Sequence, residues 1–588
     1  MLRVLFGFIF CILTVSSLMA AEPLQIVIEG LEGDVLENVE TALVPPTGLV
    51  REDKVEVPWL ERFEREAPER VRQAMEPFGY YSPQVETSVE VTEEGTYVMK
   101  VNVDPGQRVH IAEVHVKIQG PGINEPALNA FVTGFPLKVG DPLLHTKYEE
   151  AKGAFLGRCV DLGYLDAAFS VHEIRVSKAK ARASLALVLD TGSQFRFGEI
   201  TFGGAPEYPE SFLRRHLEFQ SGGIFSYKKM NLSSINFARS DRFAEVYINA
   251  DKALARDFFV PVKITLKPSD PKRFRVGGGY QTDYGPIFSS KYQDVNFLYR
   301  GHEVNAELNV SPRLQGLGVG YTWPATTDFL SKTSLSLKGQ HENIPSYDSR
   351  TISSLIEYTR NLLGAPVFGR ERLGSGYLQL QGESYTIGEE DSRSWLVMPG
   401  VRFSERHYDD LVRPRRAFNY SLDLRGTHRA LGSDTEFLQF TGYGKMLFPL
   451  PYRFSLSMRG QFGTTLQGDS FESLPPSVRF FAGGDNSVRG YDYKSLGPRD
   501  DQGNVVGGKH LLVGSVEIEK AIGKVFGLAA FYDVGNAFDN VNEMNLQQGA
   551  GIGIRLYAPF GYLRFDFARQ LNVRDPDYRI HFAVGIGL

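Results

Sequence analysis

The hydrophobic residues of the chain follow two different spacings, one in each half. From about residue 272 onward, hydrophobic and polar residues alternate, as in EVNAELNV at 303–310, RFSLSMR at 453–459 and RIHFAVGIGL at 579–588. A period of two places every second side chain on the same face of a β-strand. The polar face carries full charges, such as Glu303 and Glu307 between the apolar residues of the first segment.

These strands fit a membrane better than a water-soluble sandwich. A sheet in lipid cannot leave an edge open, so it closes into a barrel with apolar side chains outward and polar ones in a wet lumen. With about 10 residues per strand plus turns and loops, residues 272–588 suit an antiparallel transmembrane β-barrel of about 16 strands, within a range of about 14 to 18.

The first half has a different pattern, in which short β-branched runs alternate with helical stretches. LQIVIEG at 24–30 is followed by WLERFEREAPERVRQAMEPFGY at 59–80 and then by VETSVEVTEEGTYVMKVNV at 85–103. This order is typical of small α+β domains.

An internal repeat divides this half. VDPGQRVHIAEVHVKIQG at 103–120 recurs as LDTGSQFRFGEITFGG at 189–204, and a helix followed by Gly-Tyr occurs at 79–80 and again at 163–164. The residues that match across the first pair, at a common offset of 86, are Asp104 and Asp190, Gly106 and Gly192, and Glu113 and Glu199. The repeat predicts three modules, at 22–105, 106–190 and 191–268, of which the third is the weakest copy. Their sheet edges could pair with extended segments of other chains, or the modules could be spacers.

The N-terminus predicts export. Arg3 precedes the apolar run VLFGFIFCILTV, and small residues follow before AEP, which together form a secretory signal peptide over residues 1–20. Once it is cleaved, Cys159 is the one remaining cysteine, so no intramolecular disulfide is possible. Cys159 lies in a predicted helix, where we expect a buried thiol that packs as a small hydrophobe.

Composition and motifs exclude several classes of function. No segment after the leader has about 18 uninterrupted apolar residues, so spanning helices are not expected. A net charge of −6 gives no sign of nucleic-acid binding. The G-x-S-x-G elbow is absent, the His-Glu pairs at 302–303 and 341–342 lack the second histidine of a zinc helix, and GNVVGGKH at 503–510 has His510 where a phosphate loop needs Ser or Thr. We therefore expect no enzyme, no cofactor and no metal.

The most specific motif is RFFAGGDNSVRGYDYKSLGPRD at 479–500. It resembles the Arg-Gly-Tyr loop of the outer-membrane insertase superfamily that includes BamA, TamA and the two-partner secretion transporters. The resemblance implies that this loop descends into the barrel lumen with Arg489, Gly490 and Tyr491 at its tip. It also implies that acidic residues of the inner wall hold the arginine.

The strands after the loop provide such residues. In LLVGSVEIEK at 511–520 and LAAFYDVGNAF at 528–538, alternation places Glu517 and Asp533 on the inward face, in contexts that match the family's acidic wall. The segment GAGIGIRLYAPFGYLRFDFARQL at 549–571 resembles the family's penultimate hairpin, with Arg555, Arg564 and Asp566 inward. An arginine held by carboxylates would make hydrogen bonds that a lysine could not reproduce.

Glycines mark the place where the barrel closes. Gly277, Gly278 and Gly279 lie in the predicted first strand, whose segment RVGGGYQTDYGPIF resembles the start of the TamA barrel, and Gly585 and Gly587 lie in the last strand. Glycine weakens a strand, so this seam should open more readily than the others. The resemblance implies a lateral gate here, although the glycines could instead serve curvature or a bulge. The chain departs from the outer-membrane pattern at its last residue, Leu588, where Phe or Trp is usual.

Three modules before one barrel resemble the TamA branch of the family. The resemblance implies a periplasmic, POTRA-type extension on an outer-membrane barrel that helps insert or translocate nascent outer-membrane proteins, autotransporters above all, with a TamB-like protein anchored in the inner membrane as partner. A role in moving phospholipid to the outer membrane stays open.

Two other functions compete with this hypothesis. A two-partner-type secretion pore would export one dedicated substrate and carry a plug helix before the first module. The expected mature chain starts almost directly at LQIVIEG, which leaves no room for such a helix. A plain porin would leave the three modules and the Arg489 loop unexplained.

Overall fold

The computed structural model describes residues 23–587 except 52–53, 94, 364–369, 389, 410–414, 524 and 559–560. The predicted signal peptide at 1–20, the first residue of the expected first module and the terminal Leu588 lie outside the described residues. The chain forms two compact units, the second of which joins most of the third module to the barrel. Within the described residues, no helix has the length and apolar character to cross a membrane.

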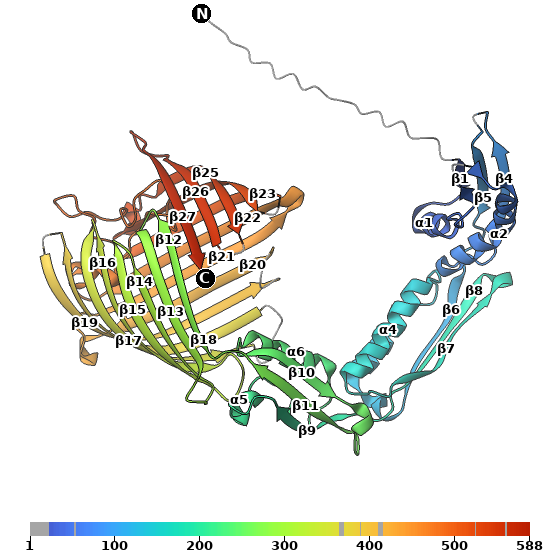
Figure 1. The fold of residues 1–588 in the computed structure, drawn as a ribbon, viewed down its shortest axis with the longest axis horizontal. Helices are drawn as coiled ribbons and strands as arrows, with labels where there is room; N and C mark the ends of the chain where they lie inside the picture. Colours follow the sequence, from blue (N-terminus) through green and yellow to red (C-terminus); the bar gives the residue numbers. More distant parts are fainter. Residues whose placement is uncertain are drawn as a thin grey trace, which may run out of the picture. The chain divides into compact units, whose positions relative to one another are not determined.

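Three small α+β modules precede the barrel, as expected (Figure 1). The first contains β1 (Leu24–Glu29), α1 (Gly33–Ala42), β2 (Val50–Arg51), β3 (Lys54–Val55), α2 (Val57–Met75), β4 (Gln84–Val91) and β5 (Tyr97–Asp104). The second contains β6 (His110–Gln119), α3 (Pro126–Thr133), α4 (His145–Asp161), β7 (Ala168–Ser177) and β8 (Arg182–Asp190). The third contains β9 (Arg196–Gly203), α5 (Glu210–Arg214), α6 (Tyr227–Arg239), β10 (Phe243–Ala250) and β11 (Phe259–Pro268).

Each module has a three-stranded sheet whose central strand is the last strand of the module: β1-β5-β4, β6-β8-β7 and β10-β11-β9. Helix α4 shows why the helices pack on these sheets. Its buried residues Tyr148, Ala151, Phe155 and Cys159 recur at intervals of three and four, which gives the helix one apolar stripe. Cys159 is fully buried, and burial raises the pKa of its thiol to about 11.

The internal repeat has a structural counterpart at the joints between modules. Asp104 accepts a hydrogen bond from the amide of Gly106 through Oδ1 at 3.0 Å, and Asp190 does the same for Gly192. Both glycines have a positive φ, which residues with a side chain rarely adopt. Asp270 forms the same kind of turn with the amide of Lys272 at the entry to the barrel.

The third module is fastened to the barrel through Arg215. Its Nη2 donates to the carbonyls of Asp328, Phe329 and Ser331, at 3.0, 2.8 and 3.0 Å, in the turn between two barrel strands. Burial lowers the pKa of Arg215 to about 10, and Phe329 packs beside the buried ring of His216. This buried contact lies within the second compact unit, which contains most of the third module together with the barrel.

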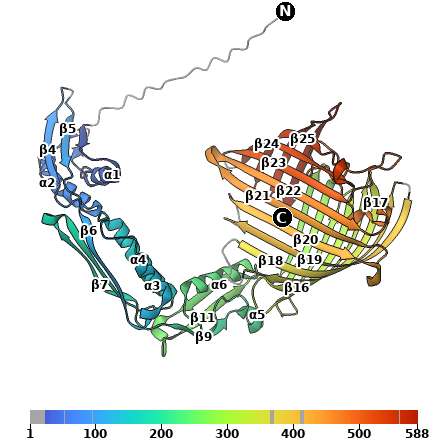
Figure 2. The same ribbon diagram turned by 180° about the vertical axis from the view of Figure 1, so that it is seen from behind.

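Sixteen antiparallel strands form a closed barrel, which confirms the predicted fold and strand number (Figure 2). Their bounds are β12 Lys272–Gln281, β13 Gly285–Phe297, β14 His302–Val310, β15 Leu314–Pro324, β16 Lys332–Ile344, β17 Tyr347–Asn361, β18 Arg370–Ile387, β19 Glu390–Tyr408, β20 Ala417–Thr427, β21 Phe437–Leu450, β22 Phe454–Gln467, β23 His510–Ile522, β24 Phe526–Phe538, β25 Gln547–Ala558, β26 Gly561–Gln570 and β27 Tyr578–Gly587.

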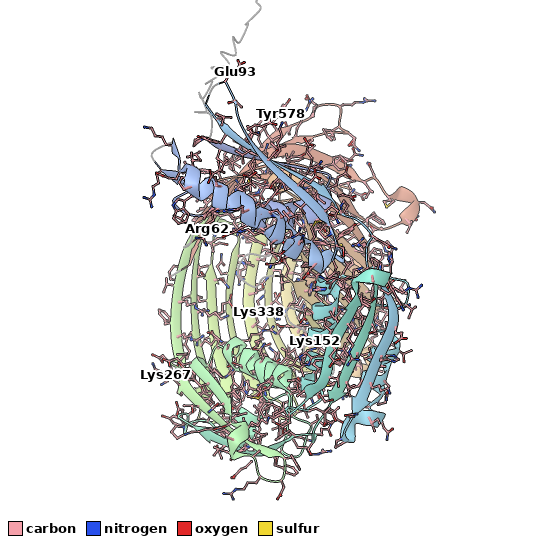
Figure 3. All side chains as sticks on the ribbon, turned by 90° about the vertical axis from the view of Figure 1, so that its right-hand side faces the viewer. Arg62, Glu93, Lys152, Lys267, Lys338 and Tyr578 are labelled. Carbon is pink, nitrogen blue, oxygen red and sulfur yellow. The ribbon has the colours of Figure 1, made fainter. Side chains whose placement is uncertain are left out.

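The two faces of the barrel differ as the alternation predicts. Outward residues such as Leu337 and Ile352 are exposed, whereas Tyr347 and Glu383 on the lumen side are buried under the loop between β22 and β23. Figure 3 draws the side chains on the ribbon, with Arg62 on α2, Lys152 on α4 and Lys267 on β11 marking the modules, and Lys338 on β16 and Tyr578 on β27 marking the barrel. The apolar outer face is the surface that lipid would cover.

Candidate functional site

The connection between β22 and β23 folds back into the lumen of the barrel. It closes on itself through two hydrogen bonds of 2.9 Å between the backbones of Ala482 and Leu496. The segment between these residues contains Asp485, Val488 and Arg489, all at most 2% exposed. The Arg-Gly-Tyr sequence is therefore at the tip of a folded, buried loop.

Arg489 binds the inner wall through its whole guanidinium group. Nε and Nη2 donate to the two carboxylate oxygens of Asp533 at 2.7 and 3.0 Å, and Nη1 donates to Glu517 at 2.7 Å. Nη1 also donates to Asp566 at 3.0 Å, and the guanidinium carbon lies 3.4 Å from the ring centroid of Phe531. The structure thus brings the three residues named from the sequence together and adds Asp566, which the sequence placed inward but did not connect to the loop.

A second arginine shares these carboxylates. Arg555 donates to Glu517 at 2.8 Å and to Asp566 at 2.5 Å, and Arg564 lies 3.7 Å from Asp566. Buried charges are tolerated when each is paired, and removal of one partner leaves the others uncompensated. The network therefore depends on the loop remaining in place.

The backbone conformation at the tip of the loop explains why residue 490 is a glycine. Gly490 has φ of 100°, and its carbonyl accepts from Gln570 at 2.9 Å. On the wall, a Cβ at Gly549 would lie 1.9 Å from the carbonyl oxygen of Arg489, so the wall is bare where the loop touches it. Tyr491 completes the contact by donating to Gln547 at 3.2 Å.

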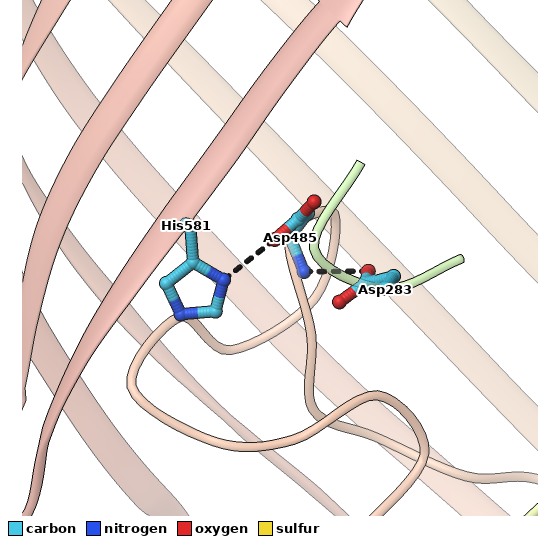
Figure 4. A group of neighbouring side chains, drawn as sticks. All are labelled: Asp283, Asp485 and His581. Carbon is cyan, nitrogen blue, oxygen red and sulfur yellow. Dashed lines mark hydrogen bonds and ion pairs between the residues drawn. The ribbon is translucent and has the colours of Figure 1, made fainter. Parts of the chain in front are cut away.

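A buried group of three side chains, Asp283, Asp485 and His581, ties the loop to both sides of the seam (Figure 4). The amide of Gly490 donates to Nε2 of His581 at 2.8 Å, and Nδ1 of His581 lies 2.5 Å from Asp485. Because Nε2 accepts, Nδ1 carries the proton and donates to Asp485. The amide of Asp485 in turn donates to Asp283 at 2.8 Å, so the loop is bonded to the β12–β13 turn and to β27 at once.

The chemistry of this group favours a hydrogen-bonded tie over a metal centre. Its possible ligand atoms lie within 4.8 Å of one another, which is close enough for an ion. However, both nitrogens of His581 are already engaged, and a metal on Nδ1 would place a proton on Nε2 against the Gly490 amide. Burial, and next the neighbouring Asp485, raise the pKa of Asp283 to about 7.

The seam joins β12 and β27 over a short ladder. Gly277, Gly278 and Gly279 pair with Gly587, Ile586 and Gly585, and the ladder ends at Gln281 with Ala583. β12 pairs with β13 over its whole length, so within the described residues Lys272–Val276 have a partner on one side only. A Cβ at Gly279 would lie 2.4 Å from the carbonyl oxygen of Val584, so this glycine permits the close approach of the strands.

Just beyond the ladder, Thr282 closes the outer end of the seam. Its amide donates to the carbonyl of Phe582 at 3.0 Å, and its hydroxyl accepts from the amide of Phe582 at 2.7 Å. Sequence reasoning did not identify Thr282, Asp283 or Asp485, since all three lie in turns or loops where no period fixes the direction of a side chain.

Fold and site together define an outer-membrane β-barrel that carries periplasmic modules and a loop anchored in its lumen. A model of the Omp85 superfamily domain matches residues 296–588, and a model of POTRA domain 1 of TamA matches residues 25–105. The chain belongs to the Omp85 superfamily, and its first module is a TamA-type POTRA domain.

Curated relatives agree with this family at low identity. The chain is 22% identical over 395 residues to the outer membrane protein assembly factor BamA of Nitratidesulfovibrio vulgaris, covering 64% of this chain and 49% of that protein. It is 21% identical over 605 residues to BamA of Neisseria meningitidis serogroup B, covering 90% of this chain and 74% of that protein. The chain thus spans about half the length of the first relative.

Solved structures share the fold. BamA from Haemophilus ducreyi lacking POTRA domains 1–3 has a TM-score of 0.60 at 16% identity, covering 82% of this chain and all of that chain. CdiB from Acinetobacter baumannii has a TM-score of 0.51 at 14% identity, covering 95% of this chain and all of that chain.

Proposed function

We propose that this protein is a TamA-like assembly factor of the outer membrane, which helps insert or translocate autotransporter-type β-barrel proteins through a lateral gate between β12 and β27. The observation that carries the proposal is the short seam ladder, which among the described residues joins 277–281 to 583–587, while Lys272–Val276 pair there with β13 alone. An incoming strand can pair with such an edge by main-chain hydrogen bonds. The modules, taken as residues 22–105, 106–190 and 191–268, would reach into the periplasm.

Hydrogen bonds from the lumen loop hold the two sides of the gate together. Asp283 and His581 lie on opposite sides of the seam, and Asp485 and Gly490 of the loop bond to them. Separation of β12 from β27 therefore breaks at least one of these bonds, while the ion pairs of Arg489 can hold the loop on the β23–β26 wall. In this mechanism a client strand must supply enough new hydrogen bonds to offset those lost.

A TamB-like partner and a role in outer-membrane lipid transport belong to the same proposal. They are supported by the match of the first module to the TamA-type POTRA domain and by three modules before the barrel. The test is a pull-down of the tagged, full-length protein from envelope extract, with a tagged porin as control. A TamB-like protein specific to this bait supports the proposal, and a single secreted substrate without such a partner would favour a two-partner-type secretion pore.

Client assembly is tested separately. Cells depleted of the protein should show less autotransporter passenger at their surface, and the wild-type chain should restore it. Unchanged passenger display and barrel assembly after depletion would contradict the assembly function.

A further inference from the structure

The outer face of the barrel carries two free arginines beside an apolar hollow, far around the wall from the seam. Arg350 on β17 and Arg393 on β19 are both exposed, and neither has a hydrogen-bond or ion-pair partner among the described residues. The hollow has a volume of about 720 Å³, and both arginines line it.

Register places the cations in one row across four strands. From β16 to β19, the residues that face one another in successive strands are His341, Arg350, Ser384 and Arg393. Neighbouring strands lie about 4.8 Å apart, so the two arginines are separated by roughly 10 Å. Two positive charges at this spacing can each meet a separate anionic group.

The next outward row forms the floor of the hollow. Across the same four strands, this row consists in order of Gly339, Ile352, Gly382 and Trp395. Ile352 is 74% exposed and Trp395 is 46% exposed, while the two glycines between and beside them have no side chain to fill the space. The floor is therefore an apolar groove with an amphipathic indole at its side.

The position of the row along the strand points to the outer leaflet. The third module binds the β15–β16 turn, which therefore marks the periplasmic end of the barrel, so β17 begins at the extracellular end. Arg350 lies three residues from that start, and the next outward arginine, Arg360, lies near the periplasmic end of the strand. Ten residues at about 3.4 Å each, tilted by roughly 40°, span about 26 Å along the barrel axis, which matches the apolar band of an outer-membrane barrel. Arg350 and Arg393 are then level with the headgroups of the outer leaflet.

We propose that this hollow binds the lipid A part of lipopolysaccharide, with its phosphates on Arg350 and Arg393 and an acyl chain over Gly339 and Gly382. Guanidinium groups bind phosphate by charge-assisted, often bidentate hydrogen bonds. Two carboxylates lie nearby: Asp348 is bonded to His341 at 3.1 Å, and Asp434, which also lines the hollow, accepts from the amide of Trp395 at 2.6 Å. Neither forms an ion pair with Arg350 or Arg393 among the described residues, so both guanidinium groups can bind an anionic headgroup.

The test measures lipid A retained by the purified full-length protein in detergent, by native mass spectrometry after incubation with diphosphoryl lipid A. Arg350→Gln with Arg393→Gln should reduce retention about tenfold or more, since both phosphate contacts are lost. Arg360→Gln is the matched control, because it removes an outward arginine of the same strand at the other end, and it should retain lipid A as the wild type does. Heat-modifiability of each variant verifies that the barrel is folded.

A second variant tests the groove without touching the charges. A Cβ at Gly339 has open space within 4 Å and one at Gly382 meets only ordinary contacts with Trp395, so Gly339→Leu with Gly382→Leu should fold and should also lose lipid A. Dioleoyl phosphatidylglycerol serves as the competing anionic lipid. Wild-type retention by either double variant, or equal binding of phosphatidylglycerol, would overturn the proposal.

Discussion

The guanidinium of Arg489 meets the carboxylate of Asp533 edge to edge, with Nε 2.7 Å from Oδ2 and Nη2 3.0 Å from Oδ1. Both side chains are almost completely buried. Arg489→Ala would leave Asp533, Glu517 and Asp566 with fewer positive partners in a buried site, which costs about 3–5 kcal/mol. We expect the midpoint of urea unfolding in detergent to fall markedly.

The control for this prediction is Arg499→Ala, in the same loop, whose side chain donates to the carbonyl of Gly503. It should leave the midpoint within the error of the wild type. Arg489→Lys keeps the charge but cannot reproduce the two-pronged contact, so it should lie between wild type and Arg489→Ala. Equal midpoints for wild type and Arg489→Ala would show that the loop is not anchored by this ion pair.

The raised pKa of Asp283 should make the stability of the folded protein depend on pH. Burial and Asp485 raise its pKa to about 7, so the folded state holds this proton more tightly than the unfolded chain does. The resulting stability is present below the unfolded pKa and is lost as the pH rises through the folded value. Asp283→Asn still accepts from the Asp485 amide but does not titrate. Its melting temperature should therefore fall less than that of the wild type between pH 5 and pH 8, two values on either side of the folded pKa; a parallel fall in both proteins would refute the assignment.

Cys159 should be inert in the folded protein. It is fully buried, and the pKa of its thiol is raised to about 11, so almost no thiolate is available at neutral pH. Maleimide labelling of the mature protein should be slow until a denaturant is added. An added cysteine at the exposed Ser177, in the same module, should react at once, and rapid labelling of Cys159 itself would contradict the packing of α4.

Arg215 should hold the third module against the barrel. Arg215→Ala removes the donor to three carbonyls of the turn at 328–331, so amide hydrogen exchange in this turn should accelerate. Arg214→Ala is the control, because its exposed side chain pairs with Glu210. Unchanged exchange in Arg215→Ala would mean that the turn is held by its own contacts.

The period of the strands explains which parts of the site were predictable. Alternation places Glu517 and Asp533 inward from the sequence alone, because every second side chain of a strand points to the same face. It places Asp566 and His581 inward as well, but their contact with the loop depends on the register between strands, which no local pattern records. Asp283 and Asp485 lie in a turn and a loop, where tertiary contacts alone determine direction.

The fold was more predictable than the seam. Strand number follows from the length of the alternating segment, and three modules follow from the repeat of Asp104 and Asp190. The ladder between β12 and β27 depends on how far the strands shift along one another as the barrel closes. That the described part of β27 pairs with only 277–281 of β12 could therefore be seen only in the structure.

The lateral gate is tested most directly by a disulfide across the seam. Thr282 and Phe582 exchange hydrogen bonds, so by alternation Gln281 and Ala583 form the non-hydrogen-bonded pair, with Cα atoms roughly 4.5 Å apart, a spacing that a disulfide accepts. Gln281→Cys with Ala583→Cys should cross-link, and Ser289→Cys with Asn309→Cys, across β13 and β14, is the control.

The measurement is autotransporter passenger display in cells that carry each oxidised pair in place of the wild-type protein. If β12 and β27 must separate, the seam disulfide abolishes display and reduction restores it, while the control disulfide has no effect. Full display with the seam quantitatively cross-linked would show that β12 and β27 need not separate, and it would contradict the proposed gate.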